Sequence, residues 1–193
     1  LTKEYGVIGV IAKGAKSLKS NLRSATDKLI YANFTIYYKK DKLSILSEAR
    51  IINNFSNIKK DIEKISYASY ILDLTNQVYK QCESSEIYDL LINSLKKIND
   101  NFNILAITNI LELKYLNYLG VMPNLDGCSL CGSKNIITLS SDKGGYLCKR
   151  CHTNEPIVSE NTIKLIRMYN YVDIKKISKL DLDINIIKEV NNF

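Results

Sequence analysis

The spacing of hydrophobic residues changes near residue 54 and divides the chain into two parts. Before that point, β-branched and aromatic residues gather in three short stretches of the kind found in strands. These stretches are residues 5–12, 26–38 and 43–51. A loop rich in Gly, Ser and Lys follows the first stretch, and a charged turn follows the second. Three strands with short connections predict a small antiparallel sheet or barrel, and we expect its first strand to be missing from this sequence.

Apolar residues recur at helical spacing through the second part. The first predicted helix, over about 58–82, has an expected buried stripe of Ile58, Ile62, Ile65, Ser69, Leu72 and Val78. Ser84 and Ser85 are suited to cap the second helix. Its stripe is Ile87, Leu90, Leu91, Ser94, Leu95 and Ile98.

A third predicted helix, over about 104–119, is apolar on several faces, which is typical of a buried central helix. Gly120 is expected to end it, with Pro123 just beyond. Two more helices are predicted, one after Ser159 and one capped by Asp181 or Asp183. The fold class is therefore α+β.

Four cysteines form two CxxC pairs separated by 16 residues. They are Cys128, Cys131, Cys148 and Cys151. Both thiolates of a CxxC pair reach one ion, and two pairs complete a tetrahedron, so the spacing predicts a structural zinc site that leaves no position for water. Gly132 suits the tight turn after the first pair. Gly144 and Gly145 predict a hairpin turn between short strands at 136–139 and 146–147.

Other roles for these cysteines are less consistent with the sequence. Two disulfides would need an oxidising compartment, and the sequence shows no signal-peptide pattern. A redox CxxC normally occurs singly, beside a βαβ pattern. His152 is an alternative ligand to Cys151, although a solvated position or one beside the ligands suits it better. The fifth cysteine, Cys82, lies in a helical stretch and is expected to be inert.

The net charge of +7 is concentrated at the start of the chain. Residues 1–50 carry ten Lys and Arg against four Asp and Glu, whereas residues 51–193 carry 17 against 16. A local basic surface favours a polyanion, because each phosphate contact releases condensed counterions. A solvated basic face without a partner is the alternative. No apolar run reaches membrane-spanning length, so we expect a cytoplasmic protein without a membrane partner.

Catalysis is not expected. Metal-dependent phosphoryl chemistry needs clustered Asp, Glu and His, but the chain has one His and no acidic cluster with ligand spacing. A Ser or Cys nucleophile lacks an evident base, because His152 lies in the zinc segment. We therefore expect neither an enzyme nor a small-molecule substrate. A competing interpretation is a protein–protein adaptor with a zinc-stabilised helical part and an incidental basic face.

Four segments together resemble the bacterial recombination mediator family RecO. They are residues 10–15, 46–49, 67–70 and 119–132. A CxxC pair alone is common, but the order of a strand, a Lys-Gly-Ala loop, a helix and an LGxxPxLxxCxxCG segment is far more specific. The resemblance covers essentially the whole chain. It implies an N-terminal OB-fold over 1–54 and a helical domain over 55–193, with a zinc module at 124–156 inserted in the helical domain.

The resemblance also implies binding of single- and double-stranded DNA at the bacterial nucleoid, annealing of complementary strands, and work with RecR and single-strand-binding protein to load recombinase. A small β domain that carries the basic excess fits an OB-fold DNA binder. The expected phosphate contacts are Lys13, Lys16, Lys19 and Arg23, followed by Lys39, Lys40, Lys42 and Arg50. Aromatic residues expected either to stack on bases or to fill the barrel are Tyr31, Phe34, Tyr37 and Tyr38. Protein partners are assigned to the nearly neutral helical part.

Overall fold

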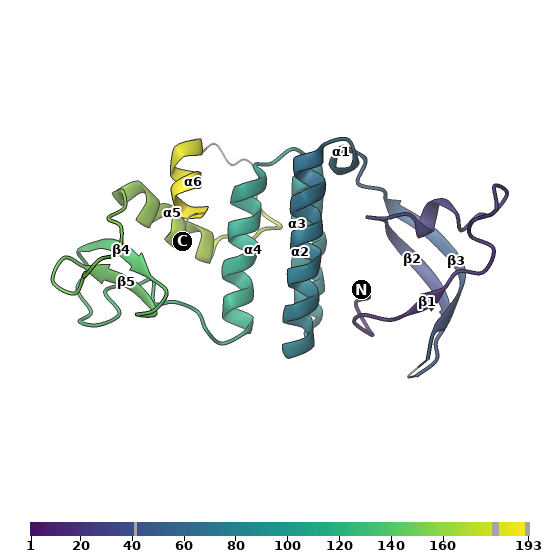
Figure 1. Cartoon of the computed structure of the whole chain (residues 1–193), viewed down its shortest axis with the longest axis horizontal. Coiled ribbons are helices and arrows are strands. Elements are labelled where there is room, and N and C mark those ends of the chain that lie inside the picture. The colour runs from purple at the N-terminus through teal and green to yellow at the C-terminus, as the bar shows by residue number, and fades with distance from the viewer. Residues whose placement is uncertain (41, 179–181, 192–193) are drawn as a thin grey trace.

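The computed structural model describes residues 1–40, 42–178 and 182–191. The molecule is elongated, with a small sheet at one end, helices in the middle and a two-stranded hairpin at the other end (Figure 1). No helix in these described ranges is both long and apolar enough to cross a membrane.

The first part of the chain forms an open three-stranded sheet. β2 (Tyr31–Tyr37) and β3 (Ser44–Asn53) pair antiparallel, and β1 (Val10–Ile11) joins the other edge of β3 in parallel. The prediction of an antiparallel sheet is therefore wrong for β1. The described residues form a sheet in the order β1-β3-β2, with two free edges, and do not close it into the expected barrel.

Local turns shorten the first two predicted strands. Gly6 has a positive φ of 63°, and its carbonyl accepts the Thr2 N–H, so the chain reverses where a strand was predicted. Successive turns then lead to a 3-10 helix, η1 (Ser24–Thr26), in front of β2. The hydroxyl of Thr26 donates to the Leu22 carbonyl over 3.0 Å. Such side-chain bonds satisfy backbone groups locally and compete with strand pairing.

Short polar side chains begin the helices that follow. These helices are α1 (Ser56–Lys59), α2 (Ile62–Gln81), α3 (Ser85–Asn99) and α4 (Ile104–Tyr118). Asp61, Ser84 and Asn103 each accept a backbone N–H in the first turn of α2, α3 and α4, respectively. Gly120 follows α4 with a φ of 71°, and this confirms the predicted helix end.

The buried face of α2 differs from the predicted stripe. Ala68, Ile71, Thr75 and Val78 are buried, whereas Ser69 is exposed and Ile62 is 80% exposed. The reason is a break in the helix. Ile58 belongs to α1, and α2 restarts after the Asp61 cap, so the apolar period of the two helices is not continuous. The stripe predicted for α3 is confirmed, with Leu90 only partly buried.

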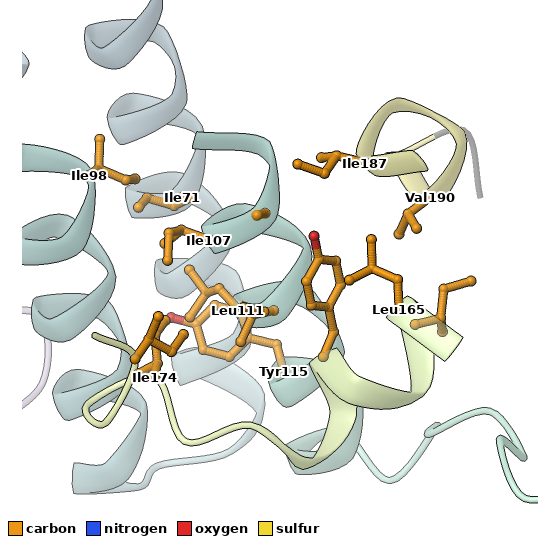
Figure 2. Packing of buried hydrophobic residues seen from close by; sticks show 14 of the residues in the cluster. Ile71, Ile98, Ile107, Leu111, Tyr115, Leu165, Ile174, Ile187 and Val190 are labelled. Carbon is orange, nitrogen blue, oxygen red and sulfur yellow. The ribbon is translucent and has the colours of Figure 1, made fainter. Parts of the chain in front are cut away.

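Helix α4 lies at the centre of the core, as predicted. It contacts α2 and α3 on one side, and α5 (Glu160–Tyr171) and α6 (Ile184–Asn191) on the other. In Figure 2, Ile107 and Leu111 of α4 lie between Ile71 and Ile98 on one side and Leu165, Ile187 and Val190 on the other. Burial of these side chains removes apolar surface from water and so holds the helices together.

The predicted starts of the last two helices are also confirmed. The Ser159 hydroxyl accepts the Thr162 N–H at the start of α5. Asp183 accepts the Asn185 N–H over 2.8 Å at the start of α6. The alternative cap, Asp181, lies outside the described residues.

One buried hydrogen bond across α2 and α4 gives a test of this core. The hydroxyls of Thr75 and Tyr115 are 2.7 Å apart, and both residues are almost fully buried. We expect Tyr115→Phe to lower the free energy of unfolding by about 0.5–1.5 kcal/mol, because the hydrogen bond is lost while the ring packing stays. Thr75→Val in the Tyr115→Phe background should add little, and urea unfolding of the four proteins would show this coupling. Additive effects of the two changes would contradict the bond.

Candidate metal centre and nucleic-acid interface

A small β-hairpin positions the predicted zinc ligands. β4 (Ile136–Ser140) and β5 (Gly145–Cys148) pair antiparallel where two short strands were predicted, with the glycine turn between them. The backbone of Asn124 runs beside the hairpin: its N–H donates to the Gly144 carbonyl, and its carbonyl accepts the Tyr146 N–H. A Cβ atom on Gly145 would lie 2.4 Å from the Asn124 carbonyl oxygen, so only glycine fits at this position.

The four predicted cysteines come together beside this hairpin. The sulfur atoms of Cys128, Cys131, Cys148 and Cys151 all lie within 4.8 Å of one another. Each pair closes a tight turn, in which the Gly132 N–H donates to the Cys128 carbonyl over 2.8 Å and the His152 N–H donates to the Cys148 carbonyl over 2.9 Å. Gly132 has a φ of 72°, which explains the glycine after the first pair.

The electrostatics of the cluster favour a divalent cation. Burial raises the pKa of the Cys128 thiol, but backbone N–H groups at Cys148, Leu130 and Cys131 outweigh it and lower that pKa to about 6. A hydrogen bond with Cys131 raises the pKa of Cys151 to about 12. Neighbouring thiols therefore cannot all ionise unless positive charge is placed between them. Four sulfur ligands fit tetrahedral Zn²⁺ and leave no open position.

His152 is not one of the clustered ligands. Its Nε2 atom lies 2.6 Å from the Glu155 carbonyl oxygen. A carbonyl only accepts, so Nε2 carries the proton and donates there. An ion pair of 2.8 Å between Lys143 and Glu155 connects the β4–β5 turn to the segment that follows His152. Cys82 lies outside the cluster, at the end of α2.

The cysteine-bearing hairpin is attached to the helical core. The Tyr146 ring is fully buried, and its hydroxyl donates to the Ile163 carbonyl of α5 over 2.7 Å. The Arg167 side chain of α5 donates to the Leu125 carbonyl over 3.0 Å. Metal bound at the four cysteines would therefore stabilise the surroundings of α5 as well as the hairpin.

The structure places the eight predicted phosphate contacts on the surface of the sheet-bearing part. All eight side chains are exposed, and none forms an ion pair with any other described residue. They do not form one cluster. Lys13, Lys16, Lys19 and Arg23 follow β1 in the loop that leads to η1, whereas Lys39, Lys40 and Lys42 lie at the β2–β3 turn. Arg50 pairs with Asn33 near the opposite end of β3 from that turn.

The structure separates the two alternatives for the aromatic residues. Phe34, Tyr37 and Tyr38 are exposed, because the open sheet leaves them uncovered. Tyr31 instead packs against the helical core. Tyr5, which the sequence placed only in a strand, stacks on Tyr38 with the ring centroids 5.1 Å apart. No spacing rule links two residues so far apart in the chain.

We expect Cys128→Ser to reduce bound zinc from about one ion per chain to none, because three thiolates hold the ion poorly. The melting temperature of the helical core should fall as well, since structural zinc contributes directly to folding. Cys82→Ser is the matched control and should keep the metal. Zinc content by mass spectrometry and thermal unfolding by circular dichroism test both. A stable, zinc-free Cys128→Ser protein whose wild type also lacks zinc would refute the site.

Two adjacent glycines give a second test of the hairpin. Gly145→Ala should destabilise the protein by about 2–4 kcal/mol, because its Cβ would meet the Asn124 backbone and the φ is 144°. Gly144→Ala should cost only about 1 kcal/mol, since nothing lies within 4 Å of its Cβ position and the strain comes from φ alone. Chemical denaturation of both variants measures the difference; equal losses would argue against the close Asn124 contact.

Comparisons with known proteins agree with this architecture. The family model described as Recombination protein O N terminal matches residues 1–55, and Recombination protein O C terminal matches residues 59–193. A protein from Listeria monocytogenes serotype 4b named DNA repair protein RecO is 31% identical over 186 residues, covering 94% of this chain and 72% of the relative.

Relatives from other organisms carry the same name. The DNA repair protein RecO of Halalkalibacterium halodurans is 30% identical, covering 94% of this chain and 73% of the relative. The DNA repair protein RecO of Exiguobacterium sibiricum is 30% identical over 188 residues, covering 94% of this chain and 75% of the relative. Both matched models and these relatives cover the sheet, the helices and the cysteine hairpin together, so the chain belongs to the RecO family of DNA repair proteins.

Proposed function

We propose that this chain is a non-catalytic recombination mediator that binds single- and double-stranded DNA and helps complementary strands to anneal. The observation that carries the proposal is the exposure of the eight cations of the sheet-bearing part, with no ion-pair partner among the described residues. Unpaired Lys and Arg side chains are available to phosphates, and each contact releases counterions.

Neutralisation gives annealing its physical basis. Two phosphate backbones repel each other, and a cationic surface lowers the cost of bringing them together. The exposed rings of Phe34, Tyr37 and Tyr38 add base stacking, which contributes about 1–3 kcal/mol per stacked base. Stacking needs unpaired bases, so these rings would favour single strands before they pair.

Zinc has a structural part in this proposal. The four thiolates fill the coordination shell, so no position remains for a reacting water. RecR and single-strand-binding protein are the proposed protein partners, and we assign both to the helical part. Loading of recombinase would then combine DNA held by one end of the molecule with proteins held by the rest.

The triple change Lys13→Glu, Lys16→Glu and Lys19→Glu tests the DNA face. We expect weaker binding to a fluorescent single-stranded oligonucleotide. The slope of log K against log salt concentration should become shallower by about 2, at about 0.7 per lost phosphate contact. Anisotropy titrations at several salt concentrations measure both, and strand annealing should slow in parallel.

A matched control removes the same charge elsewhere. Lys80, Lys164 and Lys188 are exposed on α2, α5 and α6, and their combined change to Glu should have a much smaller effect. Equal losses in the two triple variants would mean that only net charge matters. A wild-type chain that fails to bind DNA at low salt would refute the proposed function.

A further inference from the structure

The boundary between the sheet and the helices carries cations that no sequence pattern groups together. Asp27, directly after η1, forms an ion pair with Lys59 of α1 over 3.0 Å. The Asp27 carboxylate also accepts the Lys28 N–H over 2.9 Å, which holds the backbone of Lys28 beside this ion pair. The Lys96 ammonium of α3 lies 5.4 Å from the centre of the Tyr31 ring, at the start of β2.

These residues connect to the loop that carries the predicted phosphate contacts. Asp27 lines an open hollow of about 690 Å³ together with Lys16 and Arg23 of that loop. The same carboxylate therefore lies between the loop cations and Lys59 of the helical part. We call Lys16, Arg23, Lys28, Lys59 and Lys96 the seam strip.

The seam strip has a large excess of positive charge. It combines five cations with Asp27, while the carboxylates Glu4 and Asp89 lie near Tyr88 beside Tyr31, and Asp89 is paired with Lys3. The hydrogen bond from Lys59 lowers the pKa of Asp27, so that carboxyl is ionised at neutral pH and offsets one charge only. Lys16, Arg23 and Lys28 are exposed, and Lys59 and Lys96 are partly exposed. Repulsion among these cations is relieved when a polyanion binds along them.

We propose that the path of bound nucleic acid crosses this boundary, so that a strand held by the loop continues over the seam strip onto α1 and α3 of the helical part. This inference rests on the proposed function and extends it, because the near-neutral charge of residues 51–193 predicts no DNA contact there. A phosphate backbone suits a strip of separate cations that is continuous with the loop, since it offers a negative charge at every nucleotide.

Asp27 limits binding in this arrangement. It holds Lys59 in an ion pair, so this lysine is not free to contact a phosphate. Removing the carboxylate frees Lys59 for phosphate and removes a repulsive charge from the path. Variants at Asp27 and Lys59 should thus change DNA affinity in opposite directions, which a purely structural ion pair would not do.

The experiment measures binding of single-stranded oligonucleotides to the zinc-loaded full chain over a salt series. Lys59→Gln with Lys96→Gln should reduce the salt dependence of log K by about 1.4, at about 0.7 per lost contact. Asp27→Asn should raise affinity at low salt roughly 2- to 5-fold, the range that one exposed charge pair supplies. Lys59→Arg with Lys96→Arg should keep the wild-type salt dependence, because both charges are kept.

The matched control is Lys164→Gln with Lys188→Gln. It removes the same charge, and Lys164 also gives up an ion pair, with Glu160 at 2.6 Å, but both residues lie on α5 and α6 away from the boundary. It should leave the salt dependence unchanged. Thermal unfolding and zinc content confirm that every variant is folded.

Several outcomes would overturn the inference. Lys59→Gln with Lys96→Gln could keep the wild-type salt dependence while the triple change at Lys13, Lys16 and Lys19 still weakens binding. That result would overturn the inference and leave the proposed function standing. Equal effects in the seam and control variants would mean that only the net charge of the protein affects binding, and this too would overturn the inference. If the seam variant keeps DNA binding but loses binding of polyglutamate, the strip serves an acidic protein instead. A wild type that binds no DNA would overturn both proposals.

Discussion

The burial of α4 between two pairs of helices is the constraint on which the rest of the molecule depends. A helix without a polar face needs neighbours around its whole circumference. α2 and α3 cover one side, and α5 and α6 cover the other. In sequence, the cysteine-bearing hairpin lies between α4 and α5, so it has to return the chain to the open side of α4. The buried Tyr146 and the bond from Arg167 to the Leu125 carbonyl fix that return.

The cysteine hairpin and the three-stranded sheet lie at opposite ends of the molecule (Figure 1). The hairpin end holds the cysteine cluster, whereas the sheet end holds the eight exposed Lys and Arg residues predicted to contact phosphate. This separation allows the proposed DNA contacts to vary without affecting the metal ligands. Tyr31 and Lys59 connect the two regions of the chain, since each links the sheet side to the helices.

Features set by neighbouring residues could be predicted from the sequence. The caps at Ser84 and Ser159, the helix end at Gly120 and the CxxC pairs each depend on spacings of a few residues, and the structure contains all of them. The all-round apolar α4 was also a reliable signal. Its position at the centre follows from composition alone, because no other place buries every face.

Features set by distant contacts could not be predicted. The stripe of α2 was displaced because a break at Asp61 resets the helical phase, which single-helix periodicity does not reveal. The sheet was expected to close into a barrel, but the residues on either side of β1 form turns and do not extend the strand. Lys59 and Lys96 lie in segments of nearly balanced charge, and only the tertiary fold brings them beside Asp27 and Tyr31.

The position of the hairpin between α4 and α5 has a kinetic consequence. Half of the cover for α4 comes from residues beyond the metal ligands, so the core is complete only after a long loop has closed. Long-range closure slows folding, and ordering the loop on a metal ion shortens the search. Metal bound at the four cysteines would therefore act during folding itself, and a chain that emerges without it would leave one face of α4 open to association with other chains.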